Sequence, residues 1–206
     1  MDASKFWDVI SNYNEATYLL QVVLLVALVV SCMLARKGKL VWLPKVAYGL
    51  TSIYLAVVFF LFFGTEPIQY FFAFPVYLVL GITFIFEAVK HKEENFEKLT
   101  KIQWLFSGLV AVYPLVSIFQ GKMFPKMLLY IMPCPVICIG MIIWLGYKRR
   151  NLLSLALLTL WGLTGIKAFF FDAYEDIILL AVGIYALVIL ILEIKKRSFI
   201  THTKSD

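Results

Sequence analysis

The segment Met132-Pro133-Cys134-Pro135 is the most distinctive chemical feature of this 206-residue chain. Pro133 and Pro135 lack backbone donors and clash with the preceding helical turn, so carbonyls near Leu129 and Ile131 lose their helical partners. Helices broken in this way often line ion or substrate sites, where the freed carbonyls act as ligands. The alternative is a helix that begins near Pro133 after a short ordered loop, since proline is common in a first helical turn.

Sulfur atoms gather on the helix that follows. Cys134 and Cys138 are four residues apart on one face, and Met132 and Met141 lie near the same stripe. Soft ligands of this kind suit Cu(I) or another thiophilic ion, so the two cysteines are candidate metal ligands. The alternative is packing, because cysteine and methionine usually fill apolar interiors and no histidine accompanies them. All three cysteines, Cys32 included, lie in apolar stretches, so no disulfide framework is implied. We expect no cofactor.

Lys167 lies inside an apolar stretch, about one turn from its end, and acidic residues follow it. A cation within a membrane is costly to bury unpaired, which makes it a functional candidate. Its alternative role is structural, because a long lysine reaches the interface and pairs with an acid there. We expect a pathway for a solute or cation, with an acidic outer mouth, formed by Pro133, Cys134, Pro135, Trp161, Thr164, Lys167, Asp172, Glu175, Asp176 and Glu66.

The elements that must position these residues are membrane-spanning helices. Hydrophobic residues make up 62% of the chain and its mean hydropathy is +0.88, which excludes an ordinary soluble domain. Runs of roughly 17 to 25 apolar residues, the length that crosses a bilayer, cover 17–34, 46–63, 70–89, 102–119, 127–145, 152–171 and 177–194. No period-two pattern marks a barrel. The sequence predicts an all-α polytopic protein with seven transmembrane helices.

Basic residues set the predicted orientation. Fifteen of the nineteen Lys and Arg residues fall on one side of the seven-span zigzag. By the positive-inside rule, the N-terminus lies outside and the C-terminus is cytoplasmic, in a cytoplasmic membrane. The net charge of +6 is therefore a topology signal, and we expect no nucleic-acid partner. The expected divisions are an interfacial amphipathic segment at 1–15, a transmembrane domain at 16–195 and a cytoplasmic tail at 196–206.

Two finer expectations concern the arrangement of the spans. Spans one to three and five to seven share basic turns and Phe-Phe-acidic turns, which indicates a three-plus-one-plus-three repeat like that of small carriers. Chance is the alternative, because topology dictates loop charges in any such chain. We expect the longest loop, residues 90–101, to be a solvated linker or helical extension. Glu87, just before this loop, is expected to pair with Lys90 one turn further along the helix.

Several short motifs together resemble those of a known family. They are Phe6 to Gln21, Glu66-Pro67-Ile68 leading into Tyr70-Phe71-Phe72, Tyr113-Pro114-Leu115, Phe124-Pro125-Lys126-Met127 and the Pro-Cys-Pro segment. The family resembled consists of small prokaryotic multi-pass membrane proteins and is known as a domain of unknown function. The resemblance implies an integral membrane protein without an established activity, so it transfers no catalytic residue. Its pattern has threonines after Pro-Cys-Pro, whereas this chain has Val136 and Ile137, and Lys167 stands where the pattern has a small residue.

Three functions are open for such a chain. The leading hypothesis is passage of a small solute or cation, by rocking of helices about proline and glycine kinks. The second is a sensory or accessory membrane protein that acts through protein contacts. The third is an intramembrane metal-handling protein or enzyme that uses Cys134 and Cys138. An enzyme is not expected, because the sequence has no Ser-His-Asp set, HExxH motif or Gly-rich phosphate loop. Oligomeric state does not follow from the sequence.

Overall fold

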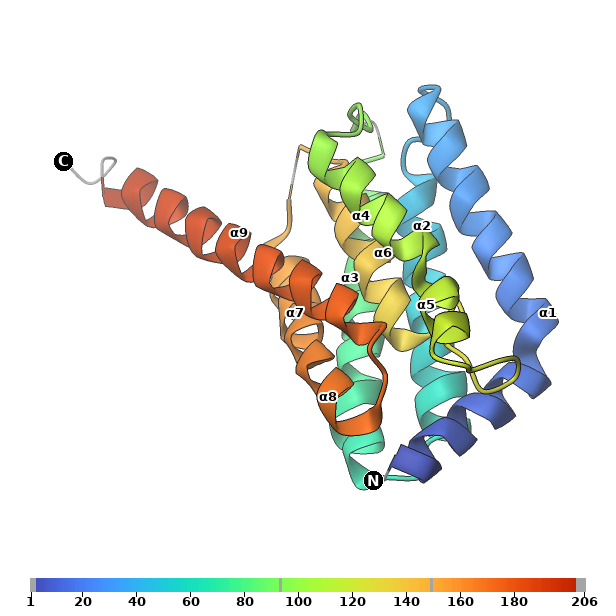
Figure 1. Cartoon of the computed structure of the whole chain (residues 1–206). Helices are drawn as coiled ribbons and strands as arrows, with labels where there is room; N and C mark the ends of the chain where they lie inside the picture. The colour runs from blue at the N-terminus through green and yellow to red at the C-terminus, as the bar shows by residue number, and fades with distance from the viewer. Residues whose placement is uncertain (1–2, 93, 149, 203–206) are drawn as a thin grey trace.

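The computed structural model describes residues 3–92, 94–148 and 150–202, and these fold into helices (Figure 1). In chain order the helices are α1 (Ala3–Arg36), α2 (Leu43–Tyr54), the π-helices η1 (Leu55–Phe62) and η2 (Gln69–Ala73), α3 (Phe74–Lys90), α4 (Lys101–Ala111), α5 (Tyr113–Phe119), α6 (Pro133–Leu145), α7 (Leu152–Leu163), the 3-10 helix η3 (Thr164–Lys167), α8 (Ala168–Phe171) and α9 (Asp176–His202). An isolated bridge between Phe96 and Tyr147 is the one β feature of these ranges.

Within the described ranges, five helices are long and apolar enough to cross a membrane. They cover Ala3–Arg36, Leu43–Phe62, Gln69–Lys90, Leu152–Phe171 and Asp176–Arg197. A sixth is added if α4 and α5, bent by 40° at their junction, form one span. The all-α, multi-pass architecture is confirmed. The predicted fifth span, 127–145, differs because residues 127–132 are not helical, which leaves the 13-residue α6.

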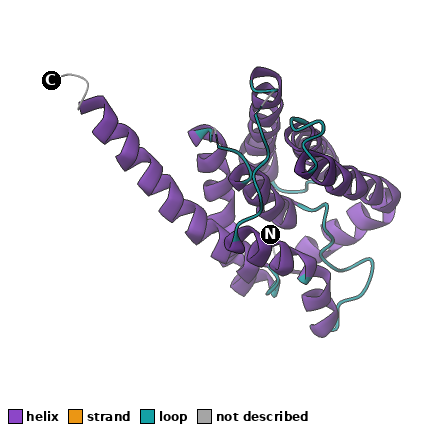
Figure 2. Ribbon diagram, turned by 90° about the horizontal axis from the view of Figure 1, so that it is seen from above, coloured by secondary structure: helices purple, strands orange, loops and turns teal. Residues whose placement is uncertain are grey.

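The central element is α6, which lies among the other helices in Figure 1 and packs against α2, α4, α7 and α9. Eleven of its 13 residues are buried. A helix that is apolar on every side is buried in this way, because it has no polar face to turn to water. In contrast, α9 leaves the bundle toward its C-terminal end in both views (Figures 1 and 2).

The two ends of the bundle differ in charge. Loops 37–42, 91–100 and 146–151 gather at one end in Figure 1, which we call the basic end. The N-terminus and loops 63–68, 120–132 and 172–175 lie toward the other, which we call the acidic end. Described basic residues at the basic end include Arg36, Lys37, Lys39, Lys45, Lys90, Lys92, Lys98, Lys101, Lys148, Arg150 and Arg197. Arg149 and Lys204, also expected on that side, lie outside the described residues.

The segment expected at the interface, 1–15, is continuous with the first span, because α1 runs unbroken from Ala3 to Arg36. Figure 1 shows its first turns crossing the acidic end at an angle to the rest of the helix. Val9, Ile10 and Tyr13 are buried there, so these turns cover the bundle. At the other terminus, α9 extends through His202 and includes most of the expected tail.

Glycine pairs bring two sets of helices close together. Gly49 of α2 faces Gly81 of α3, and Gly162 of α7 faces Gly183 of α9. A Cβ added at Gly162 would lie 2.6 Å from the Cα of Gly183. Small residues are typical of membrane helix interfaces because they allow backbones to approach. The α2–α3 and α7–α9 pairs are therefore tightly joined.

We expect Gly162→Ala to lower the free energy of unfolding by about 1–3 kcal/mol, because the new methyl group meets backbone that cannot move aside. Unfolding of the purified protein in detergent micelles measures this. Gly108→Ala is the matched control, since an added Cβ there meets no heavy atom within 4 Å. Equal stability of the two variants would contradict the close approach of α7 and α9.

Candidate functional site

The chain before α6 is an ordered, non-helical segment whose backbone is hydrogen-bonded by side chains. Asn14 Nδ2 donates to the carbonyl oxygens of Pro125 and Met127, at 2.8 Å each. The Tyr13 hydroxyl donates to the Ile131 carbonyl at 2.7 Å. Carbonyls buried without such donors would be costly in an apolar setting. Two adjacent side chains of α1 thus hold the segment in place.

Helices α3 and α5 complete this support. The Leu128 amide donates to Ser117 Oγ at 3.1 Å, and the Tyr77 hydroxyl donates to the Pro133 carbonyl. Met132 is extended, and α6 begins at Pro133. Of the two readings of the proline segment, the structure therefore shows the helix that starts at Pro133 after an ordered loop. The Ile131 carbonyl is occupied by Tyr13 and is not presented to a ligand.

A cavity of about 310 Å³ lies beside the first turn of α6. Most of its lining is apolar, and its aromatic walls are Phe6, Phe59, Phe60, Phe72, Trp161 and Phe171. Polar atoms come from Gln69, Thr164, Lys167 and the Cys134 thiol. An apolar pocket with few polar groups is the usual form of a small-molecule site, and this volume is at the small end of that class.

Irregular helices converge on this cavity. Residues from both π-helices, η1 and η2, line it, and so do Thr164 and Lys167 of the 3-10 helix η3. These are all the π and 3-10 helices of the described ranges. Such segments depart from the regular hydrogen-bond ladder and frequently occur at functional sites.

A buried ion pair forms one wall. Lys167 Nζ lies 3.7 Å from Asp176 Oδ2, and the exposed fractions of the two side chains are 24% and 0%. The Cys134 thiol donates to the same oxygen at 3.2 Å, and the Tyr113 hydroxyl donates to Oδ1 at 3.1 Å. Asp176 is the first residue of α9, where the helix dipole also favours a carboxylate. The buried carboxylate is thus fully paired, while the Lys167 side chain remains partly exposed.

Aromatic rings surround the ammonium group. Lys167 Nζ lies 5.6 Å from the centroid of the Trp161 ring and 5.9 Å from that of Phe6. Both distances allow a cation–π attraction. Trp161 Nε1 is buried and has no hydrogen-bond partner among the residues that the structure describes. Trp161 therefore contributes its ring face to the site, beside a cation.

The structure divides the residues predicted for the pathway into two groups. Pro133, Cys134, Trp161, Thr164 and Lys167 line the cavity, and Asp176 contacts it through Lys167 and Cys134. The others lie outside its lining: Pro135, buried within α6, Asp172, Glu175 and Glu66. Glu66 borders a separate cavity with Lys5 and Asp8.

The acidic residues of the expected mouth are engaged in local contacts. Glu175 is fully buried and accepts a hydrogen bond from Ser117 Oγ. Lys122 Nζ donates to the Asp172 carbonyl and lies 3.9 Å from the centroid of the Trp7 ring. Burial lowers the pKa of the Lys122 ammonium, and the nearby carboxylates, Glu175 foremost, oppose that shift. These acids brace loops of the acidic end.

A second cluster of buried charges was not predicted from the sequence. Lys45 Nζ lies 3.3 Å from Glu87 Oε2, 3.0 Å from Glu94 Oε2 and 4.0 Å from the centroid of the Tyr147 ring. The expected pairing of Glu87 with Lys90 was therefore wrong, since Glu87 turns inward to α2. Loop 91–100 is not simply solvated either, because Glu94 anchors it to Lys45. Lys45 follows Pro44 in the first turn of a helix. The residues around it do not distinguish it from the exposed lysines, so its burial could not be predicted.

The described residues contain no group of three or more His, Cys, Asp and Glu side chains that could hold a metal ion. Cys138 is fully buried, and the Cys134 thiol is directed at Asp176. A soft-metal site at these two cysteines would thus lack a third ligand of these types.

We expect Asn14→Ala to lower the free energy of unfolding by roughly 2–4 kcal/mol, because two buried carbonyls lose their donor. Asn12→Ala is the control, since Asn12 is an exposed amide on the same helix. Chemical unfolding in micelles would measure both. The role assigned to Asn14 is wrong if the two variants unfold alike.

Removing either member of the Lys167–Asp176 pair, as Lys167→Met or Asp176→Asn, should cost about 3–5 kcal/mol, because a charge remains buried alone. The double variant should cost clearly less than the sum of the two. The exposed pair Lys126–Asp8, 2.9 Å apart, is the control, and its coupling should stay below about 1 kcal/mol. A double-mutant cycle on each pair tests this, and equal coupling would contradict the burial argument.

Comparisons with known proteins give one match. A family model described as a family of unknown function (DUF6064) covers residues 3–201. No curated protein and no solved structure matches the chain.

Proposed function

The chain belongs to DUF6064, a family of unknown function, and we propose from its own geometry that it carries a small organic anion across the cytoplasmic membrane. The predicted membership of an uncharacterised family is thereby confirmed, while its Pro-Cys-Pro motif and prokaryotic range stay predictions. The observation that carries the proposal is the convergence of η1, η2, η3 and the start of α6 on one cavity that holds a buried ion pair.

The cavity indicates the class of solute. Its aromatic walls favour an apolar body, and Lys167 favours an anionic acceptor such as a carboxylate or sulfonate. Asp176 is enclosed by Tyr113 and Cys134, so a solute cation has no access to it. The solute is thus a monoanion of about the size of a substituted benzene, and a free metal cation fits less well.

Charge balance supplies a coupling mechanism. Lys167 and Asp176 neutralise each other when the site is empty. An anion that pairs with Lys167 would leave one uncompensated negative charge in an apolar cavity, which is costly. A proton taken up together with the anion restores neutrality, and Asp176 is the group placed to receive it. The proposed carrier therefore moves the anion with a proton.

The fold supports seven crossings with the basic end in the cytoplasm. The 13-residue α6 spans about 20 Å, so it falls short of a hydrocarbon core of about 30 Å. A few non-helical residues at roughly 3.3 Å each make up the difference. Irregular backbone is tolerated at membrane depth where protein surrounds it. The hydrogen-bonded residues before Pro133 meet that condition.

The cavity also supports the proposed three-plus-one-plus-three repeat. One side of its lining comes from α1, η1 and η2, and the other comes from α6, α7, η3 and α8, together with Leu128 before α6. Neither α4 nor α5 contributes to it. Carriers built from repeats bind their substrates at the interface of the two units. The glycine crossings α2–α3 and α7–α9 occupy equivalent places in the two triplets.

The first turns of α1 are the proposed gate. Phe6 stacks on Phe171 with ring centroids 5.1 Å apart, and Trp7 Nε1 donates to the Phe171 carbonyl at 3.0 Å. Phe6, Val9 and Ile10 line the cavity on the side of the acidic end. Rocking of one triplet against the other would part these contacts and open the site to the acidic end.

Binding and flux of benzenesulfonate test the proposal, because this permanent anion does not cross bilayers unaided. We expect wild-type proteoliposomes to take it up faster under an inward proton gradient. Lys167→Met should abolish binding, because the anion then has no ammonium partner in the cavity. Lys126→Met, which removes an exposed lysine at the same end, should change neither quantity.

Lys167→Met combined with Asp176→Asn keeps the variant folded, because it leaves no lone buried charge. This double variant should also fail to bind. Binding that survives in it would overturn the site assignment. Binding without flux in the wild type would overturn transport and favour the sensory alternative.

A further inference from the structure

A second cavity, of about 270 Å³, lies at the basic end, far from the site proposed for the carried anion. It is formed where the end of α3, the start of α7 and the outer part of α9 meet. Its polar lining comes from Glu87, Lys90, His91, Arg150, Asn151 and Arg197. Neither the family match nor the proposed function assigns it a role.

The charges of this cavity are unbalanced. The one carboxylate of its described lining, Glu87, already pairs with Lys45 at 3.3 Å and accepts from Ser154 Oγ at 3.4 Å. Lys90 and Arg150 have no ion pair with any residue that the structure describes. Positive charge therefore exceeds negative charge along the lining, which favours an anionic ligand.

Backbone contacts fix the two arginines. Arg150 Nε donates to the Tyr147 carbonyl at 3.1 Å, and Arg197 Nη2 donates to the Arg150 carbonyl at 3.0 Å. The Arg150 guanidinium keeps further N–H groups for a ligand, in the planar geometry that matches phosphate oxygens. The Arg197 contact also ties α9 to the start of α7 at this point.

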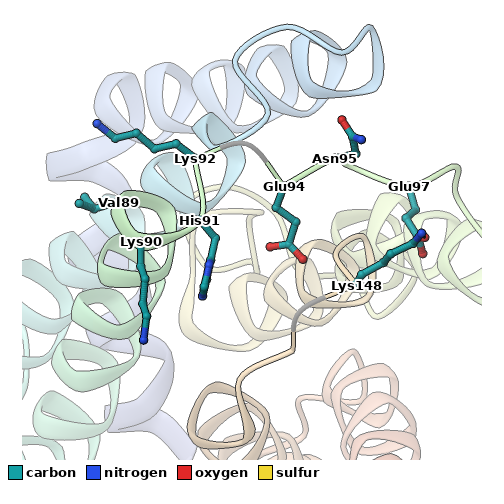
Figure 3. Close-up of a pocket in the computed structure, with 8 residues that line it drawn as sticks. All are labelled: Val89, Lys90, His91, Lys92, Glu94, Asn95, Glu97 and Lys148. Carbon is teal, nitrogen blue, oxygen red and sulfur yellow. The ribbon is translucent and has the colours of Figure 1, made fainter.

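A larger neighbouring cavity, of about 610 Å³, shares Lys90 and His91 and adds the carboxylates of Glu94 and Glu97 (Figure 3). Figure 3 shows Lys148 beside Glu97, and their charged atoms are 3.6 Å apart. Its other carboxylate, Glu94, is held by Lys45 at 3.0 Å. The described lining of the larger cavity carries three lysines against two carboxylates, whereas that of the smaller cavity carries one lysine and two arginines against one carboxylate. The excess of positive charge is therefore greater in the smaller cavity.

Apolar side chains lie close to the charges on the same helices. Phe86, Val89, Leu153 and Ile194 are each at least half exposed, at 60%, 62%, 50% and 51%. Exposed apolar residues at the end of a membrane-spanning helix face acyl chains, and basic residues next to them face lipid headgroups. We infer that this cavity binds the phosphate of an anionic phospholipid, with the acyl chains against these apolar residues. Inorganic phosphate has the same kind of acceptor oxygens and at least as much negative charge, but it gains nothing from the apolar surface.

Native mass spectrometry of the detergent-purified protein tests the inference, with phosphatidylglycerol, phosphatidylcholine and inorganic phosphate as probes. We expect one phosphatidylglycerol to bind in preference to phosphatidylcholine. Lys90→Gln combined with Arg197→Gln should weaken that binding at least tenfold, since each base near a headgroup contributes about fivefold. Arg150 is left in place because it also holds the loop. Lys37→Gln combined with Lys39→Gln removes the same charge from exposed positions of the same end and is the matched control.

Loss of binding in the first double variant alone supports the site. Equal losses in both double variants would overturn it, because general surface charge would then suffice. Inorganic phosphate that displaces the lipid at equal concentration would overturn the lipid assignment. Thermal unfolding without lipid should be equal for both double variants, which separates loss of binding from loss of fold.

Discussion

Hydrogen bonding of the non-helical chain before α6 is the constraint on which the rest of the structure depends. This chain enters the middle of an apolar bundle without a helical ladder, so every carbonyl there needs a donor from elsewhere. Tyr13 and Asn14 supply donors from α1, and Tyr77 supplies one from α3. Because these contacts fix where α6 begins, they also fix Cys134 at the cavity and α1 across the acidic end.

Two lysines, one partly exposed and one buried, show how the bundle accommodates charge. Lys167 is matched with one carboxylate and left partly open, which suits a site that exchanges partners. Lys45 is closed between two carboxylates and a tyrosine ring, which suits a fixed anchor for loop 91–100. In a medium of low dielectric both arrangements avoid a lone charge, yet they differ in whether a ligand has access. Access, more than burial, distinguishes the candidate site from a structural ion pair.

Much of this arrangement could be predicted from the sequence, because its signals are strong and local. The lengths of the apolar runs predicted the helices. Lys167 was singled out because a cation inside an apolar run needs a partner. Asp176 was one of three acidic residues that follow Lys167 in the sequence. Only the folded structure shows that it is the partner. The role of Asn14 and the pairing of Lys45 with Glu87 depend on contacts between distant segments, which have no periodic signature. The non-helical start of the 127–145 run was hidden because its residues are as apolar as those of a helix.

The π-helices at the acidic-end halves of the second and third spans have a consequence for chain length. A π turn contains one residue more than an α turn, so η1 and η2 offset the faces of their spans from those of α2 and α3. Deleting a single residue from either segment would restore the α register and rotate the adjoining stretch by about 100°. Phe59, Phe60 and Phe72 would then face lipid or neighbouring helices instead of the cavity. The aromatic wall is therefore encoded in the number of residues in these spans as much as in their identity.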